Sequence, residues 1–149
     1  FLAAGVFSQE RRSAVQYESV FTSEEHTMMG TTRDELIDWF IQDGFKVNPD
    51  LHEPEDHISF ELEYLAHMNA KAAALIREGD NLDAIKNVKR QRRFIEQHLL
   101  NWIGQLQEAA EEYAKTTFYT GMLLVCQGAL EQACEALTCV ADELPLLAA

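Results

Sequence analysis

Basic residues are scarce in this sequence, which has 12 Lys and Arg against 25 Asp and Glu and so a net charge of −13. Such an excess of acid repels nucleic-acid phosphates and anionic lipid surfaces. It argues against those ligands and favours a basic peptide as a partner. The one basic cluster, between Lys86 and Arg93, has no interleaved aromatic residue and is typical of a solvated helix face.

Long apolar runs and cysteine are also scarce. No run approaches the roughly 20 apolar residues that a membrane span requires, and no secretion signal with a cleavage site is recognisable, so we expect a cytoplasmic protein. The 3 cysteines are odd in number and fall in one apolar stretch. We expect Cys126, Cys134 and Cys139 to be small buried side chains rather than disulfide partners or metal ligands.

Apolar residues repeat at helical rather than strand spacing. The length of 149 residues fits one domain. After a short helical end and an irregular segment over 1–30, the pattern predicts an all-α bundle of about five to six helices and no strands. The expected helices span about 32–43, 54–78, 80–102, 103–113 and 117–143.

Several residues mark where these helices begin and end. Thr32 to Glu35 has the spacing of a capping box. Gly44 and Gly79 are placed as helix stops, Asp80 as a cap and Pro54 as a first helical residue, with Pro145 closing the last helix. The expected buried stripes are Leu36, Ile37, Phe40 and Ile41 in the first long helix, Ile58, Leu62, Leu65, Met68, Ala72, Leu75 and Ile76 in the second, and Phe118, Met122, Val125, Ala129, Ala133 and Ala136 in the last.

The stripe of small residues places the last helix centrally in the bundle, because small side chains allow close approach of neighbouring helices. Trp39 falls beside the first stripe. Two alternatives remain for it, a packed side chain or a partly exposed contact for a partner.

Acid and imidazole groups gather at the start of the helix predicted over 54–78. Acidic side chains there are favoured by the positive end of the helix dipole. His52 and His57 superficially resemble an HExxH zinc site, but residues five apart are turned by about 500° and face different sides. His57 and Glu61, one turn apart, form either a structural cap or a binding site. The sequence thus indicates neither a metal site nor an enzyme.

Four segments carry a resemblance to a known family. They are Tyr17 to Phe21, Glu53 to Leu65, Phe94 to Trp102 and Phe118-Tyr119, in this order. Together they resemble the TorD/DmsD family, cytoplasmic chaperones that help to mature molybdenum-containing oxidoreductases exported by the twin-arginine pathway. The resemblance covers nearly the whole chain, except that Gln16 replaces a usual proline. Family members carry further helices ahead of residue 1, so we expect 1–149 to be the C-terminal portion of one TorD-like domain.

The resemblance implies a chaperone that binds the twin-arginine leader and the apoenzyme of a molybdoenzyme precursor before cofactor insertion. Carboxylates would pair with arginine and aromatic residues would line an apolar groove for a helical leader. No cofactor is expected, no GxxxxGK[ST] nucleotide loop is present, and a homodimer with exchanged helices is plausible. The alternative is a helical interaction or oligomerisation subunit without leader specificity. The expected leader-binding residues are Tyr17, Ser19, Phe21, Gly30, Trp39, Phe40, Glu53, Pro54, Asp56, His57 and Glu61.

Overall fold

The computed structural model describes residues 16–23, 31–113 and 116–147. Within these ranges the chain is helical and forms no strand, which confirms the predicted all-α class. An isolated antiparallel bridge joins Tyr17 to His57. The elements are α1 (Glu18–Thr22), α2 (Thr31–Asp43), the 3-10 turn η2 (Pro49–Leu51), α3 (Ile58–Glu78), α4 (Asn81–Phe94), the π-helical turn η3 (Ile95–Leu99), α5 (Ile103–Tyr113) and α6 (Thr117–Leu147).

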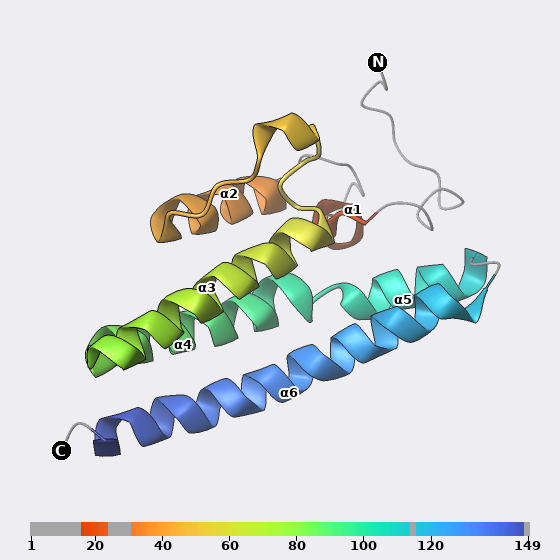
Figure 1. Cartoon of the computed structure of the whole chain (residues 1–149). Coiled ribbons are helices and arrows are strands. Elements are labelled where there is room, and N and C mark those ends of the chain that lie inside the picture. Colours follow the sequence, from red (N-terminus) through yellow and green to blue (C-terminus); the bar gives the residue numbers. More distant parts are fainter. Residues whose placement is uncertain (1–15, 24–30, 114–115, 148–149) are drawn as a thin grey trace.

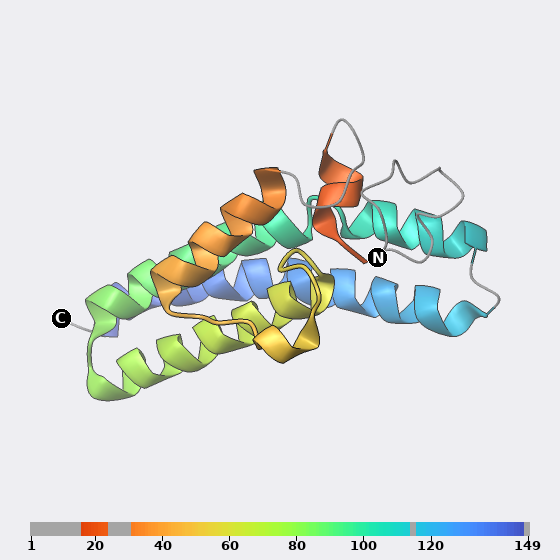
Figure 2. The ribbon, with the colours of Figure 1, turned by 90° about the horizontal axis from the view of Figure 1, so that it is seen from above.

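The helices α4 and α5 follow each other end to end and are joined by η3. The long helix α6 runs antiparallel to both (Figure 1). The helices α1 and α2 contact each other on the side of the bundle away from α6. The helix α3 packs on α4. It extends over the half of the bundle that holds the C-terminal half of α6 (Figure 2). None of the helices in the described ranges combines the length and apolar character that crossing a bilayer requires.

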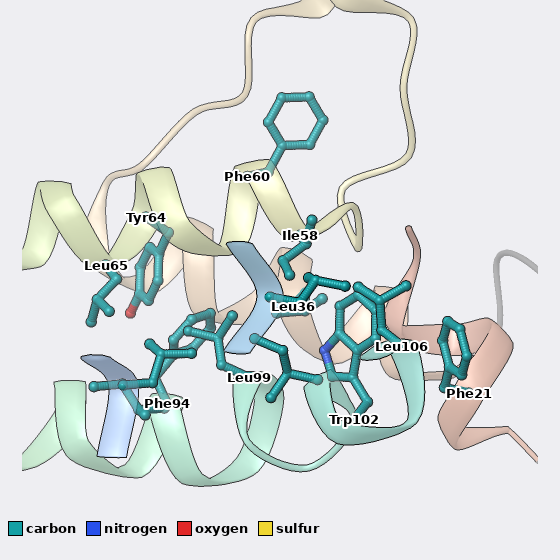
Figure 3. Close-up of a cluster of buried hydrophobic side chains, with 14 of the residues drawn as sticks. Phe21, Leu36, Ile58, Phe60, Tyr64, Leu65, Phe94, Leu99, Trp102 and Leu106 are labelled. Atoms are coloured by element: carbon teal, nitrogen blue, oxygen red, sulfur yellow. The ribbon is translucent and has the colours of Figure 1, made fainter. Parts of the chain in front are cut away.

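Aromatic side chains fill the centre of the core, where α1, α3 and η3 meet (Figure 3). Trp102 is fully buried and stacks on Phe21 with ring centroids 5.5 Å apart. Tyr64 packs against Phe94 at 4.5 Å and against Phe40 at 5.1 Å. Burying a large apolar side chain stabilises a fold by about 1.5–3 kcal/mol. This aromatic centre therefore fixes how the helices around it are placed.

The predicted boundary between the second and third long helices is confirmed. Gly79 ends α3 in the left-handed region with φ +80°, which glycine adopts without steric cost. Asp80 then caps α4, its side chain accepting a hydrogen bond from the Asp83 N–H at 3.2 Å. The ends at Asp43 and Tyr113 also agree with the prediction.

Three predicted helix ends were wrong. α3 begins at Ile58 rather than Pro54, because the His57 ring caps it through Nδ1, which accepts from the Ser59 N–H at 3.1 Å. α2 begins at Thr31, so Thr32 lies inside the helix and its hydroxyl contacts that of Thr22 at 3.1 Å. Pro145 lies within α6, whose last residue is Leu147. Because proline has no N–H, α6 lacks the hydrogen bond that residue 145 would otherwise donate to the carbonyl one turn earlier.

The predicted buried stripe of the last helix was also wrong. Phe118, Met122 and Val125 are 75%, 54% and 69% exposed. The face of α6 that is buried carries Leu123, Leu130, Ala141 and Leu144. The first half of α6 is apolar on both faces, so helical spacing alone does not show which face is packed. α6 accordingly lies at the side of the bundle rather than at its centre.

Smaller differences concern single side chains. Ile41 is 70% exposed and Ile76 40% exposed, although the other residues of their stripes are buried or half-buried. Cys126 and Cys134 are half-buried and Cys139 is exposed, with all three thiols free. The prediction of buried cysteines was therefore wrong for Cys139, and Cys126 and Cys134 are buried only in part.

Candidate functional site

The first two family-like segments pair directly with each other. The Glu18 N–H donates to the Asp56 carbonyl at 2.9 Å, and the Ile58 N–H donates to the Gln16 carbonyl at 3.0 Å. Ser19 donates two hydrogen bonds to one carboxylate oxygen of Asp56. One comes from its N–H at 3.1 Å and the other from its hydroxyl. These bonds hold α1 against the turn that precedes α3.

Three carboxyl groups are buried together where these segments meet. Glu18, Asp56 and Glu61 are 1%, 0% and 0% exposed. The Trp102 indole N–H donates to Glu61 at 3.3 Å, and His98 Nδ1 lies 3.1 Å from Glu18. One oxygen each of Asp56 and Glu61 has no hydrogen-bond partner in the described structure. The cluster thus joins residues from all of the first three family-like segments.

Burial raises the pKa of two of these carboxyl groups. For Glu18 the pKa rises from 4.5 to about 7, because desolvation outweighs the hydrogen bond and charge of His98, with Asp56 and Glu35 adding repulsion. The pKa of Glu61 is raised by desolvation and then by Glu18, against the Trp102 hydrogen bond. Like charges in a low-dielectric site disfavour ionisation of all members at once. The cluster therefore retains a proton near neutral pH.

A cleft of about 690 Å³ opens beside the Glu18–His98 pair. Residues of α1, α2 and η3 form its walls, and four of them are carboxylic acids. Neither Lys nor Arg lines it among the described residues, so its field attracts cations. The lining residues are Glu18, Thr22, Thr32, Glu35, Asp38, Trp39, Gln42, Glu96, Gln97, His98 and Asn101.

Trp39 forms an aromatic wall of this cleft. Its ring meets Phe94 and His98 edge to face, with centroids 5.6 and 5.7 Å apart. The Arg90 guanidinium lies 4.0 Å from the ring centroid and pairs with Asp43 at 2.6 Å. The ring is therefore packed. Since it also borders the cleft, contact with a partner stays a prediction.

The acidic groups expected to receive arginine at the helix mouth all have partners within the chain. Glu53 accepts from the Tyr17 hydroxyl, and Glu55 pairs with Arg33 at 2.6 Å. Asp56 accepts a hydrogen bond from the Ser19 N–H, and Glu61 accepts one from the Trp102 indole N–H. Because the side chains of Asp56 and Glu61 are inaccessible, direct contact with a ligand does not fit them, and this part of the expected site is corrected.

The remaining predicted site residues divide between core and surface. Phe21 and Phe40 are 6% and 3% exposed and belong to the core. Pro54 is half-buried beside His57, whose ring meets that of Tyr17 edge to face at 5.2 Å. Burial lowers the pKa of His57, against the charges of Glu53 and Asp56, in keeping with its role as a cap acceptor. Gly30 lies outside the described residues.

Sequence reasoning missed the acids that line the cleft. Glu35, Asp38 and Gln42 repeat at helical spacing on α2, on the side that carries Trp39. That repetition could have indicated an acidic face of α2. No sequence pattern could have indicated Glu18 and Glu96, because only the tertiary fold brings them to the same cleft. The described residues contain no group of three or more His, Cys, Asp or Glu side chains placed to hold a metal ion.

Comparison with known proteins identifies the family. The family model described as nitrate reductase delta subunit matches residues 3–108. Chaperone protein TorD of Vibrio cholerae serotype O1 is 29% identical over 123 residues, which are 83% of this chain and 54% of that protein. The TorD chaperone of Vibrio vulnificus is 25% identical over 113 residues, or 76% of this chain and 51% of the relative. That of Aliivibrio fischeri is 25% identical over 118 residues, or 77% and 54%.

The chain spans about half the length of the curated relatives that it matches. No solved structure matches it. The match with the family model covers three of the four family-like segments, at Tyr17, Glu53 and Phe94, and so confirms the resemblance seen in the sequence. The chain belongs to the TorD family, whose model carries the description nitrate reductase delta subunit.

Proposed function

We propose that this protein is a cytoplasmic chaperone, not an enzyme, that binds the twin-arginine leader of a molybdoenzyme precursor through the acidic cleft beside Trp39. Membership of the family and the name chaperone carried by its relatives support the chaperone role. The observation that carries the leader-binding role is the cleft itself, whose lining holds four carboxylic acids and, as far as the structure describes the chain, no basic side chain.

The cleft offers what a guanidinium group requires. Arginine pairs with carboxylates through paired, charge-assisted hydrogen bonds, and its planar group stacks on aromatic rings. Glu35 and Asp38 are exposed and available for the hydrogen bonds, whereas Glu96 would exchange its pairing with Arg92, at 2.9 Å, for the ligand. Trp39 supplies the part of its ring that Arg90 does not cover. The two arginines of a leader would therefore be held by α2 and η3 together.

The buried cluster acts as the support of this site. Ser19 and Asp56 fix α1, and α1 places Glu18 at the inner end of the cleft beside His98. In this proposal Asp56 is a positioning residue, and its substitution weakens leader binding by displacing Glu18 rather than by removing a contact.

Charge removal on the cleft tests this function. In isothermal titration with a twin-arginine leader peptide, the double variant Glu35→Gln, Asp38→Asn should lose about 1–2 kcal/mol of binding free energy, or roughly five- to thirtyfold in affinity. The matched control Glu108→Gln, Glu112→Gln removes two exposed acids from α5, outside the cleft, and should change affinity by less than about twofold. Equal losses in both variants would show that only net charge matters and would remove the cleft from the proposal.

A second function is favoured by a different observation. The exposed apolar side chains of α6 suit a helical interaction or oligomerisation subunit without leader specificity. The two functions differ in their preference for arginine, because lysine cannot form the paired contacts. A leader with Lys-Lys in place of Arg-Arg should bind at least about tenfold more weakly under our proposal and equally well under the alternative.

A further inference from the structure

The first half of α6 carries an apolar surface that the described structure leaves exposed. Residues 116–130 contain no charged side chain. The side of this helix that faces α4 and α5 is buried, whereas Phe118, Met122 and Val125 are 75%, 54% and 69% exposed. A helix that is apolar all round is normally buried all round, and α6 lies at the edge of the bundle (Figure 1). This exposed surface therefore has the character of an interface.

The exposed residues follow the spacing of a coiled-coil seam. They recur along α6 at intervals of four, three, four, three and four residues, as the a and d positions of a heptad do. Residues at this spacing share one side of a helix and normally pack into the matching side of another helix. Large apolar side chains occupy the first half of the seam, and small or polar ones occupy the second half. The six seam residues, all exposed, are Phe118, Met122, Val125, Ala129, Gln132 and Ala136.

We propose that a second copy of this chain covers the seam, with the two α6 helices antiparallel about a two-fold axis midway between Val125 and Ala129. Seam positions equally far from this midpoint then face each other. The facing pairs are Phe118 with Ala136, Met122 with Gln132, and Val125 with Ala129. Each pair joins a large apolar residue to a small or polar one, whereas a parallel pairing sets the large residues against each other. A two-fold arrangement of this kind closes at two copies.

The seam fits a second copy better than a charged partner. None of its six residues carries a charge, so an acidic or basic partner finds no ion pair along it, whereas its two halves match each other. The net charge of −13 on each copy opposes association, but at physiological salt repulsion beyond about 8 Å is largely screened.

The area of the seam sets the strength of the dimer. Its six residues expose roughly 500 Å² on each copy, so a pair buries about 1,000 Å², which is near the lower limit for a specific interface. We expect a weak dimer, with a dissociation constant in the micromolar range.

This association stands apart from leader binding. The helices α1 and α2, which form much of the acidic cleft, lie on the side of the bundle away from α6. Pairing through α6 leaves the cleft open in both copies. Failure of either proposal therefore leaves the other standing.

Sedimentation velocity over a range of protein concentrations tests the proposal. The 149-residue chain is measured from about 2 to 200 µM, a range that brackets micromolar dissociation constants, in about 0.15 and 0.5 M NaCl. The average mass should rise with concentration from one chain toward two. The higher salt should shift this rise to lower concentration, because it screens the repulsion between two chains that each carry a charge of −13.

Two substitutions that add the same charge separate the seam from net charge. Met122→Lys places a charge in the seam and should raise the dissociation constant at least about tenfold. Ile41→Lys adds the same charge at a 70% exposed apolar residue of α2 and should change the constant by less than about twofold. Since residue 122 faces residue 132 in the antiparallel pair, adding Gln132→Glu to Met122→Lys should recover about fivefold of the lost affinity.

Three results would overturn the proposal. One is a chain that stays a single copy at the highest concentration in both salts. Another is an equal dissociation constant for Met122→Lys and wild type, which would place the contact elsewhere. The third is a double variant that binds no better than Met122→Lys alone, which would exclude antiparallel pairing about this axis.

Discussion

The buried carboxyl of Glu18 makes a testable contribution to the pH dependence of stability. Its pKa is about 7 in the fold against an ordinary value of 4.5. Below pH 4.5 the group is protonated in both the folded and the unfolded chain, so it does not reduce the free energy of unfolding. As the pH rises from 4.5 to 7, the unfolded chain ionises first, so the free energy of unfolding falls. Above pH 7 the loss is complete.

The size of this effect follows from the difference in pKa. One pKa unit corresponds to about 1.4 kcal/mol, so Glu18 lowers the free energy of unfolding by about 3 kcal/mol between pH 4.5 and pH 7. The variant Glu18→Gln cannot ionise, and its amide remains able to hydrogen bond with His98. Its stability relative to wild type should therefore rise by about 3 kcal/mol from pH 4.5 to pH 8.

Urea denaturation followed by far-UV circular dichroism, at pH 4.5, 6 and 8, measures this difference. Glu61 has the same sign of shift and owes part of it to Glu18, so the comparison reports Glu18 together with its coupling to Glu61. The control Glu112→Gln, at an exposed acid of α5, should run parallel to wild type. Parallel curves for Glu18→Gln and wild type would refute the account of a desolvated carboxyl at this position.

Three further predictions follow from single contacts. Ser19→Ala should lower the free energy of unfolding by about 1–3 kcal/mol in the same denaturation assay, because the buried Asp56 carboxylate loses a donor; an unchanged midpoint would contradict that bond. Gly79→Ala should lower stability by about 1 kcal/mol because φ is +80°, whereas Gly104→Ala inside α5 should be neutral or stabilising, and equal thermal shifts would rule out the proposed cause. Affinity for a leader peptide in calorimetry should fall below pH 7, since a bound cation favours the ionised form of Glu18, and a flat profile from pH 6 to 8 would exclude this coupling.

Local signals in the sequence were enough to predict most of the helices. Gly79 and Asp80 mark a boundary through backbone conformation and a side-chain cap, both of which involve only nearby residues. The packed face of α6 was not predictable in the same way. Its first half is apolar on both sides, and the choice between them depends on where α4 and α5 lie.

The candidate site shows the same division. Asp56 and Glu61 stand in a run of acids at the start of a helix, where exposed side chains are the usual expectation. They are buried because Ser19 and Trp102, 37 and 41 positions away in the sequence, supply hydrogen-bond donors. The sequence identified the segments that meet at the site, but the side chains that remain open to a ligand are set by tertiary contacts.

Photo-crosslinking of a leader peptide tests the central claim most directly. A twin-arginine leader with a photoreactive residue next to the arginine pair is bound to the protein, irradiated and mapped by peptide mass spectrometry. The account predicts crosslinks on the α2 and η3 walls of the cleft, within 35–42 and 96–101. Crosslinks confined to the loop over 53–57, with none in the cleft, would contradict it.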